Sequence, residues 1–184
     1  NCIRAADIDG DGDMDLIAGN LGRNSMLKAS VKEPVEMYLN DFDNNGSVDQ
    51  VICSFENGVS YPVASLDELT EQITGLDKKF HHYSDFGGKT AEDIFGKTII
   101  AQSGLKKAVL FESCIFRNNG NGTFKMEKLP VEAQFSPVRD IIVNDFNNDG
   151  IQDIVLTGND YQVRPSLGRY DASYGAMLLG DGHG

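Results

Sequence analysis

Three short segments of this chain repeat one pattern of acidic, amide and glycine residues, and no other feature limits the fold as strongly. The segments are Asp7–Asp15, Asp41–Asp49 and Asp145–Asp153. Each has Asp or Asn at its first, third, fifth and ninth positions and Gly at its sixth. A hard cation such as Ca²⁺ takes six to eight oxygen ligands, and alternate residues of a tightly curled loop direct their oxygens towards one point. The repeated pattern therefore predicts three metal-binding loops, and so about three bound Ca²⁺ ions.

The expected ligands are side-chain oxygens at positions 1, 3, 5 and 9, together with a backbone carbonyl at position 7, where the residue type varies most. Gly at position 6 permits the turn. Asn45 and Asn147 replace acidic ligands, so we expect the first loop, with four carboxylates, to hold its ion best. The complete set of expected metal ligands is Asp7, Asp9, Asp11, Asp13, Asp15, Asp41, Asp43, Asn45, Ser47, Asp49, Asp145, Asn147, Asp149, Ile151 and Asp153.

These loops differ from EF-hand loops, which need a bidentate Glu at position 12 and a helix on each side. Asp, Asn and Gly are also common in ordinary turns, but three copies in the same order favour metal binding. Each loop is followed by an apolar, partly β-branched run that is typical of a buried strand. These runs are Leu16–Ala18, Gln50–Cys53 and Ile154–Leu156. We therefore expect each loop to join one strand to another.

The charge of the chain is consistent with this chemistry. The formal net charge is −12, from 28 acidic and 16 basic residues. Three bound Ca²⁺ ions would halve it, so much of the acidity belongs to the loops. The remaining negative charge repels phosphate backbones, and nucleic acid is therefore not an expected partner.

The cysteines and the apolar stretches exclude further classes of protein. Cys2, Cys53 and Cys114 form no Cys-x-x-Cys pair, so a zinc site is not expected. The last two lie in strand-like runs, where we expect buried free thiols, with a disulfide between them as the alternative. No apolar stretch approaches 18 residues, so we expect no membrane insertion. Because the chain begins at Asn1 and ends within a turn-like run, we expect a piece of a longer protein.

A helical insert is expected at about residues 65–96, within one repeat domain that spans residues 1–184. Ser65 and Glu68 have the spacing of a capping box. Apolar residues then recur at helical spacing on one face, which predicts a helix from about Leu66 to Phe80. A second, short helix is expected near Ala91–Phe95. Both should stand outside the sheets.

Two turns have the chemistry of β-hairpins. Asn57-Gly58 predicts a hairpin with a returning strand at Val59–Val63. Asn118–Gly122 predicts a second hairpin, between strands at Ala108–Arg117 and Thr123–Met126. A further strand at Asp140–Val143 should lead into the third loop. Apart from the helical insert, the chain is therefore expected to be all-β.

The loops and their apolar exits, with Asn119–Phe124 and Leu179–Gly182, resemble the FG-GAP/VCBS repeats, calcium-loop β-propeller repeats that also occur in integrin α-subunits. Asn40–Phe95 and Glu132–Pro137 are similar to secreted bacterial proteins related to ASPIC/UnbV and cartilage-acidic-protein domains, from Bacteroides-type organisms. The resemblance implies propeller-like repeat blades, bound Ca²⁺ and a secreted or cell-surface location, but no reaction. Metal loops for three blades are too few to close a propeller. We therefore expect an incomplete ring, or one completed by residues outside this chain.

Three classes of function follow from these features. The first is a calcium-stabilised binding or adhesion module, with a glycan or a protein as its ligand, because loops on a rigid scaffold are where recognition usually lies. The second is a carbohydrate-active enzyme, a calcium-assisted lyase or hydrolase. Its candidate residues, His81–Asp85, are adjacent in sequence and so point in different directions. The third is a structural piece of a surface protein. We expect the binding module and assign no catalytic residue, and the sequence does not indicate an oligomeric state.

Overall fold

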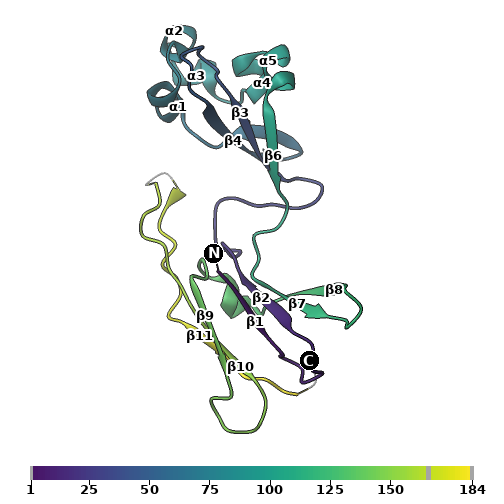
Figure 1. Cartoon of the computed structure of the whole chain (residues 1–184). Helices are drawn as coiled ribbons and strands as arrows, with labels where there is room; N and C mark the ends of the chain where they lie inside the picture. Colours follow the sequence, from purple (N-terminus) through teal and green to yellow (C-terminus); the bar gives the residue numbers. More distant parts are fainter. Residues whose placement is uncertain (1, 165–166, 183–184) are drawn as a thin grey trace. The chain divides into compact units, whose positions relative to one another are not determined.

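The computed structural model describes residues 2–164 and 167–182, and it consists mostly of antiparallel β-sheet with a few short helices (Figure 1). The chain divides into two compact units. One unit joins the segment that ends at Met26 to the segment that begins at Phe111, and the other comprises Leu27–Leu110. We call them the outer unit and the inserted unit, because the second interrupts the sequence of the first.

The outer unit contains one sheet of four strands and one of three, and all neighbouring strands are antiparallel. The four-stranded sheet has the order β1 (Cys2–Ala6), β2 (Asp15–Gly19), β7 (Cys114–Asn118) and β8 (Phe124–Lys128). The three-stranded sheet has the order β11 (Ala176–Leu178), β10 (Asp153–Thr157) and β9 (Asp140–Asn144). A 3₁₀ turn, η1 (Val131–Gln134), lies in the connection between β8 and β9.

One hydrophobic cluster packs the two sheets of the outer unit together. Residues from β2 and β7 meet residues from β9 and β10, and the connection that contains η1 adds further apolar side chains. In β2 the residues alternate between buried and half-buried, as expected for a strand with one face on a core. The buried members are Ile17, Ile115, Leu129, Ala133, Val138, Ile141, Ile154 and Leu156.

Gln134 is hydrogen-bonded to both chain segments of the outer unit that flank the insertion, the one before it and the one after it. The Gln134 amide donates to the carbonyls of Ser113 (2.9 Å) and Leu129 (3.0 Å), and its Oε1 accepts from the Ser113 N–H at 2.9 Å. Its backbone carbonyl accepts from the N–H of Arg23 at 2.8 Å. Gly22 has φ of +85°, and a Cβ there would lie 2.6 Å from the Gln134 carbonyl oxygen. Only glycine fits this contact.

The inserted unit has a four-stranded antiparallel sheet covered by helices. The strand order is β5 (Val59–Pro62), β4 (Asp49–Glu56), β3 (Val35–Asn40) and β6 (Gly104–Ala108). The helices are α1 (Leu66–Gln72), α2 (Leu76–Lys79), α3 (Tyr83–Phe86), α4 (Ala91–Phe95) and α5 (Lys97–Gln102). Their apolar residues share one buried cluster with Val51 and Cys53 of β4, so the helices form the second layer of this unit.

The expected helix from Leu66 to Phe80 is wrong in its continuity. The capping box at Ser65 and Glu68 is present, but α1 ends at Gln72 and α2 begins only at Leu76. Between them Ile73 is extended and Gly75 takes φ of 87°, a left-handed conformation that glycine adopts readily. The apolar stripe is nevertheless buried along its whole length. The expected helix at Ala91–Phe95 is confirmed as α4.

The expected single strand at Ala108–Arg117 is also wrong. β6 ends at Ala108 and β7 begins at Cys114, and the two strands belong to different sheets and different units. Both predicted hairpins are confirmed, as β4–β5 and β7–β8, and the strand before the third loop is confirmed as β9. Cys53 and Cys114 are buried free thiols, so the alternative of a disulfide between them is wrong.

Candidate metal centres

All three Asp/Asn loops are the turns of β-hairpins with one common register. The residue before position 1 pairs with the residue at position 9 in each case: Ala6 with Asp15, Asn40 with Asp49, and Asn144 with Asp153. The prediction that each loop joins strand to strand is thereby confirmed. The three loops are one structural motif used three times, twice in the outer unit and once in the inserted unit.

The backbone of the three loops repeats at two left-handed positions. The glycine at position 6 has φ of 93° in Gly12, 89° in Gly46 and 86° in Gly150. Position 4 is also left-handed, with φ of 78°, 58° and 61° in Gly10, Asn44 and Asn148. Sequence reasoning missed position 4, although Gly and Asn, the residues that tolerate this conformation best, occupy it in every copy.

The carboxylate at position 9 is buried in each loop, in Asp15, Asp49 and Asp153. One of its oxygens accepts from the backbone N–H at position 2, at 3.1, 3.0 and 2.9 Å respectively. In the outer unit the other oxygen is also bound. Asp15 accepts from the N–H of Asn118 at 2.8 Å, and Asp153 accepts from the N–H of Gly180 at 2.9 Å. Position 9 therefore ties each of these two loops to a neighbouring strand or strand end.

Two further hydrogen bonds recur within the loops. The carboxylate at position 1 accepts from the N–H at position 6, at 3.1 Å in the first loop, 2.9 Å in the second and 2.8 Å in the third. The side-chain oxygen at position 5 accepts from the N–H at position 7, at 2.8, 2.7 and 2.8 Å. These bonds curl the backbone of each loop.

The first two loops gather their carboxylates closely enough for one ion. In each group the ligand oxygens lie within 4.8 Å of one another; the groups are Asp7, Asp9 and Asp15, and Asp41, Asp43 and Asp49. Two oxygens on opposite sides of a Ca²⁺ ion lie about 4.6–5.2 Å apart, twice the length of a Ca–O bond. Within the described residues no third acidic group has this spacing. In the third loop Asn147 occupies position 3, and its amide donates to Asp149 at 2.7 Å.

Asp9 has a buried side-chain oxygen whose surroundings fit a bound cation. Its Oδ1 is buried and has no hydrogen-bond partner among the described residues. Its Oδ2 lies 3.5 Å from Nη1 of Arg117, which also binds Glu127 through Nε at 3.2 Å. A buried carboxylate oxygen without a partner is destabilising by about 1–3 kcal/mol or more. The donor chemistry and the geometry of the first loop therefore fit Ca²⁺.

In the second loop the ligand at position 3 is held by the helical segment. Oδ2 of Asp43 accepts from the hydroxyl of Thr74 at 2.5 Å and from its backbone N–H at 2.9 Å. These hydrogen bonds lower the pKa of the Asp43 carboxyl. Thr74 lies in the break between α1 and α2, so the interruption of the helix positions a residue against the loop. Sequence reasoning did not find this contact, although Gly75, directly after Thr74, is a residue that commonly ends a helix.

The remaining expected ligands lie at the rim of the loops. The side chains at position 5, in Asp11, Asn45 and Asp149, are exposed. The Asp13 side chain reaches towards Gly120 in the β7–β8 turn, where a Cβ would lie 2.7 Å from its Oδ2. That position 7 contributes its backbone carbonyl stays a prediction.

Comparisons of this chain with protein-family models, with curated proteins and with solved structures find no match. Among the described residues, no helix has the length and apolar composition needed to cross a bilayer.

Proposed function

We propose that this chain is a calcium-stabilised, extracytoplasmic binding or adhesion module built from FG-GAP/VCBS-type propeller repeats, with a glycan or a protein as its ligand. The observation that carries the proposal is the repetition of one register, three hydrogen bonds and two left-handed backbone positions in three loops of different sequence. Such repetition is expected when all three loops enclose the same kind of ligand.

The close approach of the carboxylates supports the calcium part of the proposal. Two like charges about 4 Å apart repel by roughly 4 kcal/mol at an effective dielectric constant of about 20. Each of the first two loops holds three acidic groups within 4.8 Å. A divalent ion would remove this repulsion, and it would also give the buried Oδ1 of Asp9 a partner.

The strand order of the outer unit supports the propeller part. A propeller blade is a four-stranded antiparallel sheet. β1, β2, β7 and β8 lie side by side in chain order, although Leu27–Leu110 interrupts them in sequence. The three-stranded sheet packs against this one through a shared core. In a propeller, these two sheets would correspond to one blade and to three strands of a second.

A binding module is favoured over an enzyme because the titratable candidates are scattered. His81 and His82 lie in the connection between α2 and α3, Asp85 lies in α3, and all three side chains are exposed. Tyr83 of the same run donates its hydroxyl to Asp67, so it is engaged elsewhere. General acid–base catalysis needs groups that converge on one reacting atom.

Thermal unfolding with and without calcium tests the proposal. At a calcium concentration ten times the dissociation constant, each site contributes about 1.4 kcal/mol of stability. Three sites together would contribute about 4 kcal/mol, a large part of the stability of a typical domain. We expect excess chelator to lower the melting temperature markedly and Mg²⁺ to restore little of it, because Mg²⁺ demands a smaller octahedral shell. Identical melting curves in calcium and in chelator would refute the proposal.

A further inference from the structure

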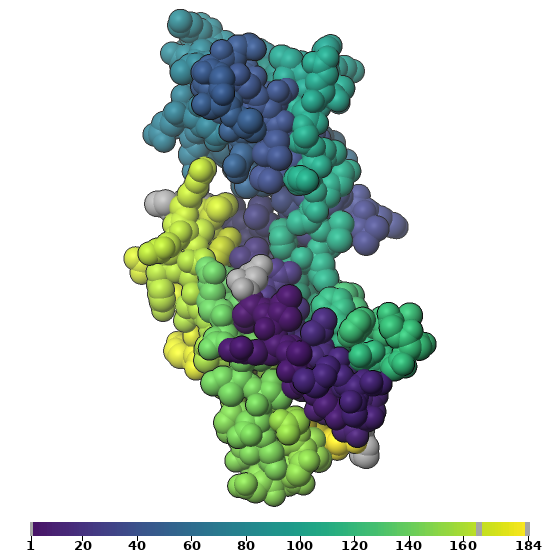
Figure 2. All heavy atoms as spheres, viewed as in Figure 1, coloured from purple at the N-terminus to yellow at the C-terminus, as the bar shows by residue number. Residues whose placement is uncertain are grey.

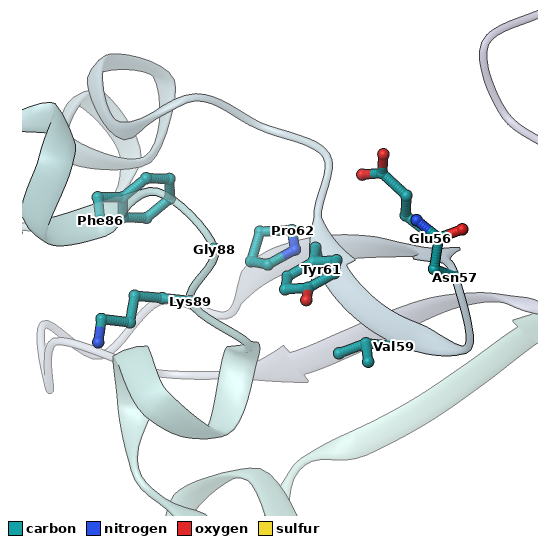
Figure 3. Close-up of a pocket in the computed structure, with 8 residues that line it drawn as sticks. All are labelled: Glu56, Asn57, Val59, Tyr61, Pro62, Phe86, Gly88 and Lys89. Carbon is teal, nitrogen blue, oxygen red and sulfur yellow. The ribbon is translucent and has the colours of Figure 1, made fainter.

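A groove of about 380 Å³ runs along the free edge of β5 in the inserted unit (Figure 3). Tyr61 and Pro62 of β5 lie at its centre. Phe86 and Lys89, from α3 and the segment after it, lie on one side, and Glu56 and Asn57 of the β4–β5 turn lie on the other. We call it the β5 groove.

Both sides of the β5 groove are held in place by the fold. Asn57 and Gly58 have φ of 51° and 81°, the left-handed pair of a tight two-residue hairpin turn. On the other side, the ring of Phe86 packs edge-to-face against Phe80, with centroids 5.7 Å apart and an interplanar angle of 83°. Phe80 itself is buried in the core of this unit. The groove is therefore largely preformed, which reduces the entropy lost on binding.

Three polar side chains that line the β5 groove have no hydrogen-bond partner in the part of the chain that the structure describes. Among the described residues, nothing is hydrogen-bonded to the Tyr61 hydroxyl, the Glu56 carboxylate or the Asn57 side-chain amide. Other tyrosines of this unit differ, since Tyr38 donates to Glu36 and Tyr83 donates to Asp67. The groove thus combines flat apolar surface with free donors and acceptors, the usual composition of a small-molecule site.

This lining fits a neutral saccharide. The face of a tyrosine ring and the pyrrolidine of a proline pack well against the C–H face of a pyranose. A carboxylate and an amide then supply the acceptors and donors that sugar hydroxyls need. Glu56 and Lys89 have opposite formal charges, and the chain as a whole carries −12, so a polyanionic glycan is disfavoured.

A peptide added as a further strand fits this edge less well. β5 has only four residues, and one of them, Pro62, has no N–H to donate. Short edge strands that contain proline are a common defence against strand addition. The edge therefore offers few backbone hydrogen bonds, whereas the side chains of the groove offer several contacts.

We propose that the β5 groove binds a neutral saccharide, with Tyr61 stacked on the sugar ring and Glu56 and Asn57 hydrogen-bonded to its hydroxyls. This inference rests on the proposed function as a binding module and names the ligand class of that module.

Titration of the calcium-loaded chain with neutral oligosaccharides of glucose, mannose, galactose and xylose tests the inference. Binding would be measured by calorimetry and by NMR shifts of residues in β5. We expect saturable binding of at least one probe, and we expect Tyr61→Ala to weaken it about tenfold or more through loss of the stacked ring. Tyr61→Phe keeps the ring and should retain most of the affinity. Tyr174→Ala, a fully exposed tyrosine of the outer unit, should change nothing.

The calcium-dependent shift in melting temperature would be measured on the same samples. Failure of the saccharide inference can then be distinguished from failure of the proposed calcium-stabilised function. If calcium stabilises the chain but no probe binds below about 10 mM, the saccharide inference is overturned while the calcium loops stand. Equal affinity in Tyr61→Ala and the parent chain would overturn it as well. Absence of the calcium shift would count against the proposed function itself.

Discussion

Among single residues, the loops depend on a few positions where the backbone conformation or the hydrogen bonds restrict which residue types fit. Positions 4 and 6 need left-handed backbone, which Gly and Asn accept far more readily than other residues. Position 9 needs a buried carboxylate that accepts the N–H of position 2. Position 3 differs between the copies, since Arg117 contacts Asp9 and Thr74 contacts Asp43. We therefore expect the calcium affinities of the loops to differ according to the contact made at position 3.

Thr74→Val should weaken calcium binding at the second loop. The substitution keeps the size of the side chain and removes the hydroxyl that donates to Asp43 at 2.5 Å. Partners that orient a metal ligand typically change affinity by about 10- to 100-fold, and we expect the lower value because the Thr74 backbone N–H remains. Thr70→Val is the matched control, since its hydroxyl donates only to the carbonyl of Asp67 in α1. Unchanged affinity of the second loop would show that Thr74 does not position Asp43.

Cys53 should make the inserted unit sensitive to alkali. Burial, reinforced by the nearby Glu36 carboxylate, raises the pKa of the Cys53 thiol from 9.0 to about 12. The folded state thus favours the neutral thiol, so its stabilisation is complete below pH 9 and is lost as the pH rises towards 12. A shift of three pKa units corresponds to about 4 kcal/mol.

Denaturant unfolding of the inserted unit between pH 8 and pH 12 measures this effect. We expect Cys53→Ala to reduce the loss of stability over that range, although Tyr38, whose pKa is raised to about 12 by burial and by Glu36, still contributes. Cys114→Ala lies in the outer unit and should leave the slope for the inserted unit unchanged. An equal slope in Cys53→Ala and the parent chain would contradict the assignment.

Among the helices and strands, the sequence predicted correctly the features that depend only on neighbouring residues, which are the turns and hairpins. The three loop hairpins follow from their Asp, Asn and Gly residues, and the Asn57-Gly58 turn follows from its left-handed pair. The break between α1 and α2 could not be predicted from the apolar stripe, because Ile73, Leu76 and Phe80 are buried whether or not the helix is continuous. The split between β6 and β7 was missed for a similar reason. A run of apolar residues does not reveal that its two halves enter different sheets.

Gln134→Leu should destabilise the outer unit by about 3 kcal/mol, because one N–H and one carbonyl would remain buried without their partner, while the Ser113 carbonyl keeps the N–H of Leu129. The groups concerned belong to Ser113 and Leu129. Gln72→Leu is the control, since its amide donates to a single carbonyl at an exposed site, and a surface change of this kind stays within about 0.5 kcal/mol. Urea unfolding of both variants measures the difference. Equal effects would mean that the hydrogen bonds of Gln134 add nothing at the insertion point.

For the molecule as a whole, each unit has its own hydrophobic core. In each unit, the two chain ends at the junction with the other unit also lie close together. In the inserted unit, the pairing of Val35 with Ala108 brings its two ends onto neighbouring strands. In the outer unit, the N–H of Gly22 donates to the carbonyl of Phe111 at 2.7 Å, so the two sides of the insertion already touch. Insertions between adjacent ends are tolerated because neither core is interrupted.

Each unit should therefore fold by itself. We expect residues 27–110 to fold as an excised domain that keeps one of the three Asp/Asn loops. The outer unit, with a short Gly/Ser linker that joins Met26 to Phe111, should fold and keep the other two loops. Dispersed NMR spectra and cooperative unfolding of both pieces would be the expected result. If either piece gave only a collapsed state without fixed side-chain packing, the two cores would not be independent.

Calorimetric titration of Ca²⁺ into the chelator-treated chain measures whether the three repeated loops bind calcium. We predict saturable binding of about three ions, with the first two loops filled before the third because only they hold three acidic groups within 4.8 Å. Asp9→Asn should weaken or remove one of the stronger sites, and Asp43→Asn should do the same at the other. A parent chain that takes up no calcium at millimolar concentration, with these two variants indistinguishable from it, would contradict the account.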